Sequence, residues 1–316
     1  MSYNLKPALT IEELISLMKD RGMQIDDEVE AARVLGQVNY YRINGFAFLF
    51  QKPNDKYSKG TSFQHIIRLM EFDAELRHLL MKHLELIEIY ARTQISHWFS
   101  LAHNRDGGAH YDPSLFVNPI FHEEYLQNLE AQIEKNKDQA FVHHHIQSFG
   151  GKMPLWSAVE ILSFSMLSKL YSNMLPDDKE LIAANMNTDS GHLTNWLHCF
   201  SVLRNACAHY SRLYQNTCSP KVSLDAPFMR KYPEVYQDTL FAYIVAMLRI
   251  LPDEIKKSFM VTSLSSLFDR YTDAINMNAI GFPENWNEIL SDKKNTTLKP
   301  VSEEKRTLKL LLNTDI

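Results

Sequence analysis

The sequence predicts an all-α fold organised around one long central helix. Glycine and proline, which disfavour helices, are scarce, at 10 and 12 of 316 residues. Residues 61–106 contain neither, and their apolar side chains recur at steps of three and four residues, as on an amphipathic helix. Thr61-x-x-Gln64 is a capping box at its start, and Gly107-Gly108 ends it. About 40 helical residues span roughly 60 Å, so this helix is the expected backbone of the fold.

Shorter helices are expected on both sides of the central one. Capping motifs such as Thr10-x-x-Glu13, together with glycine and proline, bound them at about 11–21, 27–36, 120–148, 154–176, 178–187, 192–213, 233–251 and 261–277. The aromatic segment 39–51 fits a strand or a buried helix, because periodicity does not decide in so short a run. Residues 281–286 are expected to form a turn. Residues 1–290 then form a single domain with an N-terminal helical subregion at 1–60, and 291–316 form a polar, loosely attached C-terminal tail.

Composition excludes several classes of protein. No run of 18 apolar residues is present, so no membrane span is expected. The first 15 residues lack the pattern of a secretory signal, so the expected location is cytoplasmic. A net charge of -5 excludes a basic surface over the whole chain. No P-loop, H-E-x-x-H, G-x-G-x-x-G or C-x-x-C motif occurs, so no metal or cofactor is expected.

Three other patterns are interpreted as structural. The adjacent histidines at 143–145 point about 100° apart on a helix, so they do not converge on one metal ion. Arg77 and His83, with Asp73 just before them, are interpreted as a salt-bridged face of the long helix. An odd number of cysteines indicates no disulfide framework, and burial makes nucleophilic catalysis by a thiolate unexpected. The cysteines are Cys199, Cys207 and Cys218.

The segment 198–214, HCFSVLRNACAHYSRLY, gathers polar residues on one side of a predicted helix. At about 100° per residue, five polar side chains fall within about 140° of one another, opposite an apolar face. They are His198, Arg204, Asn205, His209 and Arg212. Asn205 and His209 form an i,i+4 pair, close enough to touch. This sector is the strongest candidate for a functional site.

The same region is basic. Residues 201–232 carry five cations and one anion, which gives a local net charge of +4. The cations are Arg204, Arg212, Lys221, Arg230 and Lys231, and the aromatic residues among them are Tyr210, Tyr214, Phe228 and Tyr232. Such a surface suits RNA, because cations contact phosphates and aromatic rings stack on bases. The candidate RNA-binding residues are Arg212, Tyr210, His198, Lys221, Arg230 and Lys231. In the alternative interpretation, the tyrosines belong to the core and the cations to a solvated loop.

The polar sector also suits cleavage of RNA without a metal. In that reaction the 2′-OH attacks the adjacent phosphate, so one proton leaves the 2′-OH and another reaches the departing 5′-oxygen. Histidine serves either proton-transfer role near neutral pH, and arginine stabilises charge on the phosphate. An asparagine can fix the orientation of a neighbouring side chain. Arg204, Asn205 and His209 are therefore the candidate catalytic residues.

Six segments carry a resemblance to a known family. They are KPALTIEELI (6–15), NYYRINGF (39–46), LIEIYARTQISH (86–97), MPLWSAVEILSFSMLSKLY (153–171), LRNACAHYSRLY (203–214) and GFPENW (281–286). Over about 5–290 the chain resembles the Abi-like abortive-infection family of bacteria (AbiF and AbiD type). Its LRNACAHYSRL resembles the Arg-Asn-x-x-x-His motif of the higher-eukaryote and prokaryote nucleotide-binding (HEPN) superfamily.

This resemblance implies a HEPN-like helical bundle with additional N- and C-terminal helices. It implies a metal-independent endoribonuclease that acts as a toxin in phage defence, with RNA as substrate and with a partner, in some relatives a noncoding RNA antitoxin, that restrains it. The family's functional positions correspond to Arg204, Asn205 and His209. Proteins of the superfamily usually join two such motifs in one site. This chain has one, so a homodimer is implied in which the helices at 198–213 face each other.

Some residue roles and functions stay open at this stage. Glu88 and Arg92, which the resemblance includes, either orient the motif residues or touch RNA, or else they form a buried salt bridge. A structural role is expected for Glu160. The rival functions are a non-catalytic RNA-binding protein that scaffolds a structured noncoding RNA and a HEPN partner of a nucleotidyltransferase.

Overall fold

The computed structural model describes residues 7–296 and confirms that this part of the chain is all-α. It contains fifteen α-helices and four short 3-10 helices, and extended segments pair there only as three isolated bridges. None of the helices in residues 7–296 combines the length and the apolar character of a membrane span.

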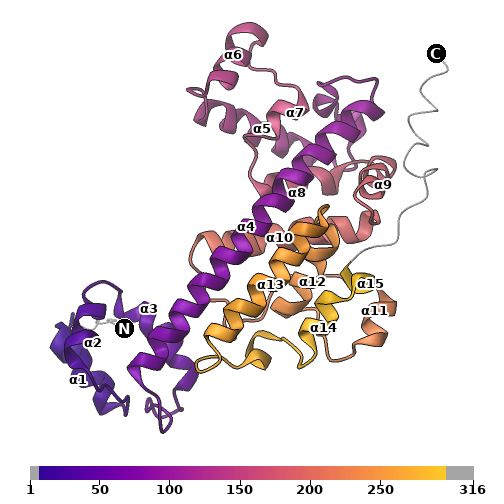
Figure 1. Cartoon of the computed structure of the whole chain (residues 1–316). Coiled ribbons are helices and arrows are strands. Elements are labelled where there is room, and N and C mark those ends of the chain that lie inside the picture. Colours follow the sequence, from indigo (N-terminus) through magenta and orange to yellow (C-terminus); the bar gives the residue numbers. More distant parts are fainter. Residues whose placement is uncertain (1–6, 297–316) are drawn as a thin grey trace.

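The predicted central helix is α4 (Phe63–Ala102), a single helix of 40 residues. It runs through the whole molecule, with α1–α3 at its first end and α5–α7 near its second (Figure 1). The predicted cap is displaced by one residue. Ser62 Oγ accepts from the N–H of His65 at 3.2 Å, whereas the Thr61 hydroxyl donates to the carbonyl of Ser58 at 2.8 Å. Thr61 therefore closes the preceding turn and leaves the capping role to Ser62.

The N-terminal helices pack on the first turns of α4. They are α1 (Ile11–Asp20), α2 (Glu28–Leu35), α3 (Tyr40–Ala47) and the 3-10 helix η1 (Phe48–Phe50). The predicted capping box of α1 is present, since the Thr10 and Glu13 side chains each accept from the other's backbone N–H. The ambiguous segment 39–51 is helical. It buries Ile43 and Phe46, which are one helical turn apart, so the segment contributes to the core as a helix and not as a strand.

Two segments predicted as single helices are each divided into two. Residues 120–148 form α5 (Pro119–Lys135) and α6 (Ala140–Phe149), because the side chain and N–H of Asn136 bond to the carbonyl of Gln132 and end α5. Residues 154–176 form α7 (Leu155–Ala158) and α8 (Phe164–Asn173). The break at 159–163 leaves carbonyl groups without helical partners, and a side chain from α4 satisfies two of them, as described below.

The core lies where α4, α10 and the C-terminal helices meet. Every residue of α12 (Leu240–Ile250) is buried, so this helix forms the centre of that half of the molecule. The elements around it are α9 (Pro176–Asn185), α10 (Ser190–Ala208), α11 (Ala226–Lys231), α13 (Glu254–Arg270), α14 (Trp286–Ser291) and α15 (Lys293–Thr296). The remaining 3-10 helices are η2 (Ala109–Tyr111), η3 (Pro113–Leu115) and η4 (Met277–Ile280).

The boundaries of the later helices differ from the prediction. The helix predicted at 233–251 starts only at Leu240, because Thr239 caps it, and the one predicted at 261–277 starts at Glu254, where Asp253 caps it. The predicted turn at 281–286 is present where α14 begins, and Gly281 has the left-handed φ of 76° that a side chain disfavours.

The first residues of the predicted polar tail are packed. Asn295 is buried, and its carbonyl accepts from Nε of the buried Arg249 at 2.8 Å. Nζ of Lys257 donates to the carbonyl of Thr296 at 3.2 Å. The description of 291–296 as loosely attached was therefore wrong, because these residues satisfy buried cations of α12 and α13. The rest of the tail, 297–316, lies outside the described residues.

Candidate functional site

The polar residues of the Arg-Asn-x-x-x-His motif lie at the C-terminal end of α10. The opposite face of this helix is buried, as predicted, against α4, α8 and α12. Its buried side chains include Trp196, Cys199, Phe200, Leu203 and Cys207. Arg204 and Asn205 are half-buried, and His209 is exposed. The motif thus lies at the boundary between the core and the solvent, where a side chain can be held from below and still reach a ligand.

Glu88 of α4 connects two arginines from two helices. Its Oε1 lies 2.6 Å from Nη2 of Arg92 on α4, and its Oε2 lies 3.7 Å from Nε of Arg204 on α10. The Glu88 side chain is only 10% exposed, whereas that of Arg204 is 36% exposed. A buried carboxylate therefore anchors one edge of the Arg204 guanidinium and leaves the group partly open to solvent.

Arg92 uses its other contacts to stabilise the break between α7 and α8. Its guanidinium donates to the carbonyl groups of Leu162 at 2.9 Å and Glu160 at 3.4 Å, and Nη1 lies 3.7 Å from the Glu160 carboxylate. The salt bridge of one alternative is therefore present, and its partner Glu88 also contacts Arg204 of the motif. Glu160 is exposed and belongs to the break, not to a buried helix, because Arg92 holds its backbone there.

Asn205 lies between Arg204 and α8. Its Oδ1 accepts from Nη1 of Arg204 at 3.3 Å, and its Nδ2 donates to Oγ of Ser165 at 3.4 Å. The predicted contact with His209 is made by the backbone, where the His209 N–H donates to the Asn205 carbonyl at 2.9 Å. The amide side chain therefore helps to orient Arg204 and takes its own orientation from Ser165.

His209 is the residue at which α10 ends. The next residue, Tyr210, has a left-handed φ of 60°. Its N–H donates to the carbonyl of Cys207 at 3.2 Å, and the N–H of Ser211 donates to that of Ala206 at 2.9 Å, which together form a Schellman end. The imidazole of His209 therefore projects from a fixed helix end and is exposed.

Arg212 is not part of this polar sector, contrary to the prediction. The helix predicted to continue to residue 213 ends at Ala208, so the angular argument does not apply to Arg212. Its Nη1 donates to the carbonyl of Gly45 in α3, and its guanidinium carbon lies 5.9 Å from the centre of the Phe46 ring. Arg212 instead joins the segment after α10 to the N-terminal helices.

Most of the aromatic residues predicted to stack on bases belong to the core. Tyr214 and Phe228 are buried, and the hydroxyl of the half-buried Tyr232 accepts from Nδ2 of Asn295 at 3.0 Å. Tyr210 differs, because its side chain is 65% exposed. The core interpretation is therefore right for three of the four, whose rings pack under the loop that carries the cations.

The cations after residue 217 are not brought to the motif. The loop turns back along α10, where Nδ2 of Asn195 donates to the carbonyl of Lys221 at 3.0 Å. Asn195 precedes Arg204 by nine residues, a rise of about 13 Å along the helix. Nζ of Lys221 lies 3.4 Å from Asp238, and Lys231 of α11 lies 3.5 Å from Asp292.

The two remaining predicted RNA contacts are both exposed. Arg230 lies on α11, near α14 and α15 and away from the motif end of α10 (Figure 1). His198 lies on α10 itself, six residues before Arg204. Of the predicted RNA-binding residues, His198 and Tyr210 are thus the ones that share the exposed side of α10 and its end with the motif.

The structure gives no support to thiol or metal chemistry in the described residues. Burial raises the pKa of the Cys199 thiol to about 11 and those of Cys207 and Cys218 to about 12, so these thiols stay protonated near neutral pH. Within residues 7–296, His, Cys, Asp and Glu side chains nowhere gather in a group that suits a metal ion.

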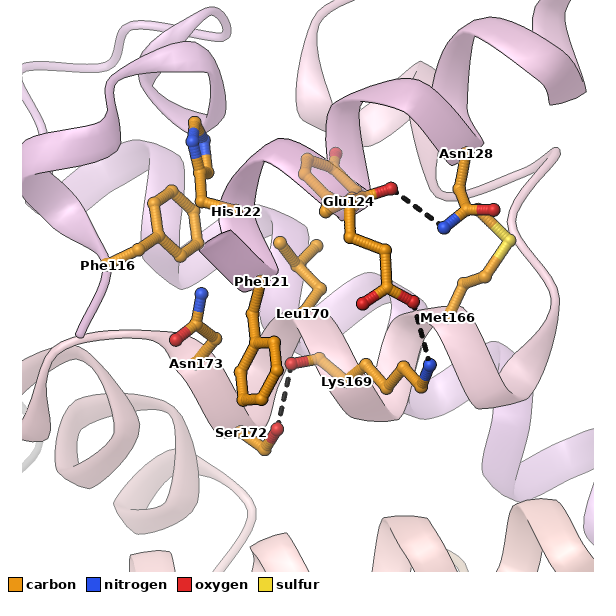
Figure 2. Close-up of a pocket in the computed structure, with 11 residues that line it drawn as sticks. Phe116, Phe121, His122, Glu124, Asn128, Met166, Lys169, Leu170, Ser172 and Asn173 are labelled. Carbon is orange, nitrogen blue, oxygen red and sulfur yellow. Dashed lines mark hydrogen bonds and ion pairs between the residues drawn. The ribbon is translucent and has the colours of Figure 1, made fainter. Parts of the chain in front are cut away.

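An enclosed hollow lies elsewhere, between α5 and α8 (Figure 2). It has a volume of about 240 Å³, and its wall includes Phe116, Phe121 and Leu170. Its polar groups are already bonded to the protein: Lys169 lies 3.2 Å from Glu124, and Asn173 exchanges two hydrogen bonds of 2.9 Å with the backbone of Asn118. With its polar groups paired in this way, the hollow offers little to orient a substrate, and it contains no motif residue.

Sequence reasoning missed several residues of the site. Ser165, which bonds Asn205, gives no sequence signal because serine is common at helix starts. Asp73 and Arg77 form a salt bridge on α4, as expected, and this pair is buried. Oδ1 of Asp73 accepts from the N–H groups of Leu213 and Tyr214 at 2.9 and 2.8 Å, so this carboxylate fixes the chain after the motif. The signal available in the sequence was a charged residue at a position of α4 that helical periodicity places toward the core.

These contacts define a class of protein: an all-α chain in which polar side chains from α4, α8 and α10 surround an Arg-Asn-x-x-x-His motif at the end of a helix. The particular family follows from comparison. Residues 33–215, more than half of the chain, match the Abi-like protein family. The chain therefore belongs to the Abi-like protein family. Comparisons with curated proteins and with solved structures give no significant match.

Proposed function

We propose that this abortive-infection protein is a HEPN-type endoribonuclease toxin that cuts RNA without a metal ion. The observation that carries the proposal is the arrangement at the end of α10. Arg204 is anchored by Glu88 and Asn205 but remains 36% exposed, and His209 is exposed one helical turn further on. A fixed cation and an accessible imidazole, five residues apart at one helix end, are the two kinds of group that cleavage by an internal 2′-OH uses.

Each motif residue then has a distinct role. The imidazole of His209 accepts a proton from the 2′-OH or donates one to the departing 5′-oxygen. The guanidinium of Arg204 binds the phosphate oxygens and stabilises the charge that grows on them. Asn205 is a positioning residue, since its side chain contacts Arg204 and Ser165. The motif occurs once in the chain, so two chains would supply the two histidines of one complete site.

The first test replaces the reacting groups. His209→Ala and Arg204→Ala are each expected to lower the rate of RNA cleavage by roughly 10²–10⁴-fold, because each removes a group that acts in the transition state. His78→Ala and Arg33→Ala are the controls, since His78 on α4 and Arg33 on α2 are exposed and lie outside the motif. Circular dichroism checks the fold of every variant. Cleavage at the wild-type rate by both folded motif variants would show that the catalytic assignment is wrong.

The second test concerns the chemistry. Cleavage is expected to persist in EDTA and to leave a 2′,3′-cyclic phosphate, because the attacking group belongs to the RNA. Mass spectrometry of the shorter product identifies its end. An absolute requirement for Mg²⁺ would point to another site. RNA binding without any cleavage would favour the rival function, a non-catalytic protein that scaffolds a noncoding RNA.

A further inference from the structure

Tyr210 has a backbone conformation that its side chain makes unfavourable. It occupies the left-handed position after α10, with φ of 60°, where glycine is the usual residue because other side chains crowd the following carbonyl. Burial does not compensate, since the side chain is 65% exposed. A bulky residue that is strained and yet exposed at the edge of a candidate site indicates use of its side chain.

Arg42 of α3 holds this residue from the other side. Its Nη1 donates to the carbonyl of Tyr210 at 3.2 Å, and its guanidinium carbon lies 5.9 Å from the centre of the Tyr210 ring. Arg212, two residues further on, donates in the opposite direction to the carbonyl of Gly45 in α3. The helix end that carries His209 is thus joined to α3 by two arginines, although α3 lies some 160 residues earlier in the sequence.

The surface formed in this way is cationic and aromatic. Residues 37–51 and 190–224 contain no Asp or Glu, so no carboxylate within these two segments opposes Arg42. Tyr210, the residue after His209, is 65% exposed. Unpaired nucleotides fit this combination, because aromatic rings stack on exposed bases while guanidinium groups bind the phosphates between them. Double-stranded RNA fits less well, since its bases are already stacked on one another.

We propose that Arg42 and Tyr210 form a subsite for an unpaired nucleotide next to the scissile phosphate. In this subsite the Tyr210 ring stacks on the base, and Arg42 fixes the Tyr210 backbone and binds a neighbouring phosphate. The proposal rests on the RNA-cleaving function proposed above and extends the site to α3, a helix outside the motif region. It also explains why Tyr210 is tolerated in a position that favours glycine.

The test compares the effect of a substitution on the thermal stability of the chain with its effect on RNA binding. Tyr210→Gly is expected to leave the melting temperature unchanged or to raise it, since glycine removes the left-handed strain. The same substitution is expected to weaken binding of a short unstructured RNA roughly 10-fold, the effect of losing one stacked base. Arg42→Ala is expected to weaken it by a similar factor. Binding is measured by fluorescence anisotropy on chains that also carry His209→Ala, so that the RNA stays intact.

Matched controls separate this subsite from a general surface effect. Tyr236, which is 67% exposed, controls for Tyr210, and the exposed Arg33 of α2 controls for Arg42. Neither Tyr236→Ala nor Arg33→Ala is expected to change binding. Cleavage by the same variants in the wild-type background is expected to fall in parallel with affinity.

Two outcomes would overturn the subsite. One is unchanged RNA binding by Tyr210→Gly and Arg42→Ala while the wild-type chain cuts RNA. The other is a fall in melting temperature for Tyr210→Gly that accounts for its loss of binding, because the tyrosine would then be structural. Failure of the wild-type chain to cut any RNA is a separate result, which contradicts the proposed function before any subsite variant is compared.

Discussion

The contribution of a charged residue on α4 to the free energy of unfolding depends on whether its side chain is buried. Asp73 is fully buried, pairs with Arg77 and accepts from two backbone N–H groups of the segment after the motif. Glu71, two residues earlier, is exposed and lies 4.0 Å from the exposed Arg68. Because an unpaired buried charge is costly whereas an exposed pair contributes little, substitution of these two carboxylates should have very different effects.

Asp73→Ala is therefore expected to lower the free energy of unfolding by about 3–5 kcal/mol, since it leaves Arg77 buried without its partner. Glu71→Ala is the matched control and should leave the free energy nearly unchanged. Denaturant titration followed by circular dichroism measures both. Equal effects of the two substitutions would contradict the assignment of Asp73 as the anchor of the loop at Leu213 and Tyr214.

Glu88 is expected to act on catalysis by positioning Arg204. Glu88→Gln keeps a hydrogen-bond acceptor but removes the charge that attracts both Arg92 and Arg204, so we expect kcat to fall roughly 10- to 100-fold through misplacement of the guanidinium. Glu85→Gln, an exposed substitution on the same helix, is the control. Steady-state kinetics separates kcat from KM. A folded Glu88→Gln chain with unchanged kcat would assign Glu88 to stability alone.

At the scale of the helices, side chains from one element bond backbone or side-chain groups at the ends of another. Arg92 bonds the carbonyl groups at the break between α7 and α8, and His110 joins η2 to α5. The His110 imidazole lies 2.9 Å from the carbonyl of Met153 and 2.7 Å from the hydroxyl of Tyr125. Nε2 donates to the carbonyl; because burial lowers the pKa of His110 to about 4, the ring is neutral near pH 7, and Nδ1 then accepts from the Tyr125 hydroxyl.

This contact predicts a dependence of stability on pH. Burial lowers the pKa of His110 to about 4, whereas an unfolded histidine titrates near 6.5. Between these values the unfolded chain binds a proton that the folded chain does not, so stability is lost as pH falls from about 6.5 towards 4. The loss from this residue is on the order of 3 kcal/mol. The free energy of unfolding measured from pH 7 to 4 should fall less steeply for His110→Gln than for the wild-type chain. Parallel curves would refute this.

At the scale of the whole molecule, α4 carries the motif region in the middle and separate groups of helices at its two ends (Figure 1). Exposed apolar side chains accompany the motif: Val202 precedes Arg204 on α10, and Ile89 follows Glu88 on α4. A two-fold dimer that pairs this face with itself would bring two histidines to one phosphate and bury these apolar groups.

A dimer of this kind predicts that inactive chains suppress active ones. Mixing a His209→Ala chain with wild type should lower cleavage below the sum of the separate activities, because each mixed dimer contains only one of the two histidines of a complete site. Val202→Glu should reduce both dimer formation and activity, whereas Val29→Glu on the exposed face of α2 should not. Light scattering measures assembly. A strictly monomeric chain with full activity at nanomolar concentration would contradict the dimer.

The sequence by itself determined the helical class, the long α4 and the apolar face of α10, because these depend on local propensity and on a period of 3.6 residues that is written in the chain. It also brought Arg204, Asn205 and His209 together, since they are neighbours within one helix end. The breaks at 136–139 and 159–163 were missed because no glycine or proline marks them.

Tertiary structure decided which polar residues support the motif. Glu88, Ser165 and Arg42 lie on three helices far apart in the sequence, and only the packing of α4, α8 and α3 around the end of α10 brings them to it. The same packing removed Arg212, Lys221 and Lys231 from the motif, because the loop after α10 is fixed by buried contacts such as those of Asp73 and turns back along the helix. The spacing of residues within one segment does not predict such contacts. The distance between two side chains from different segments depends on how the helices pack against one another.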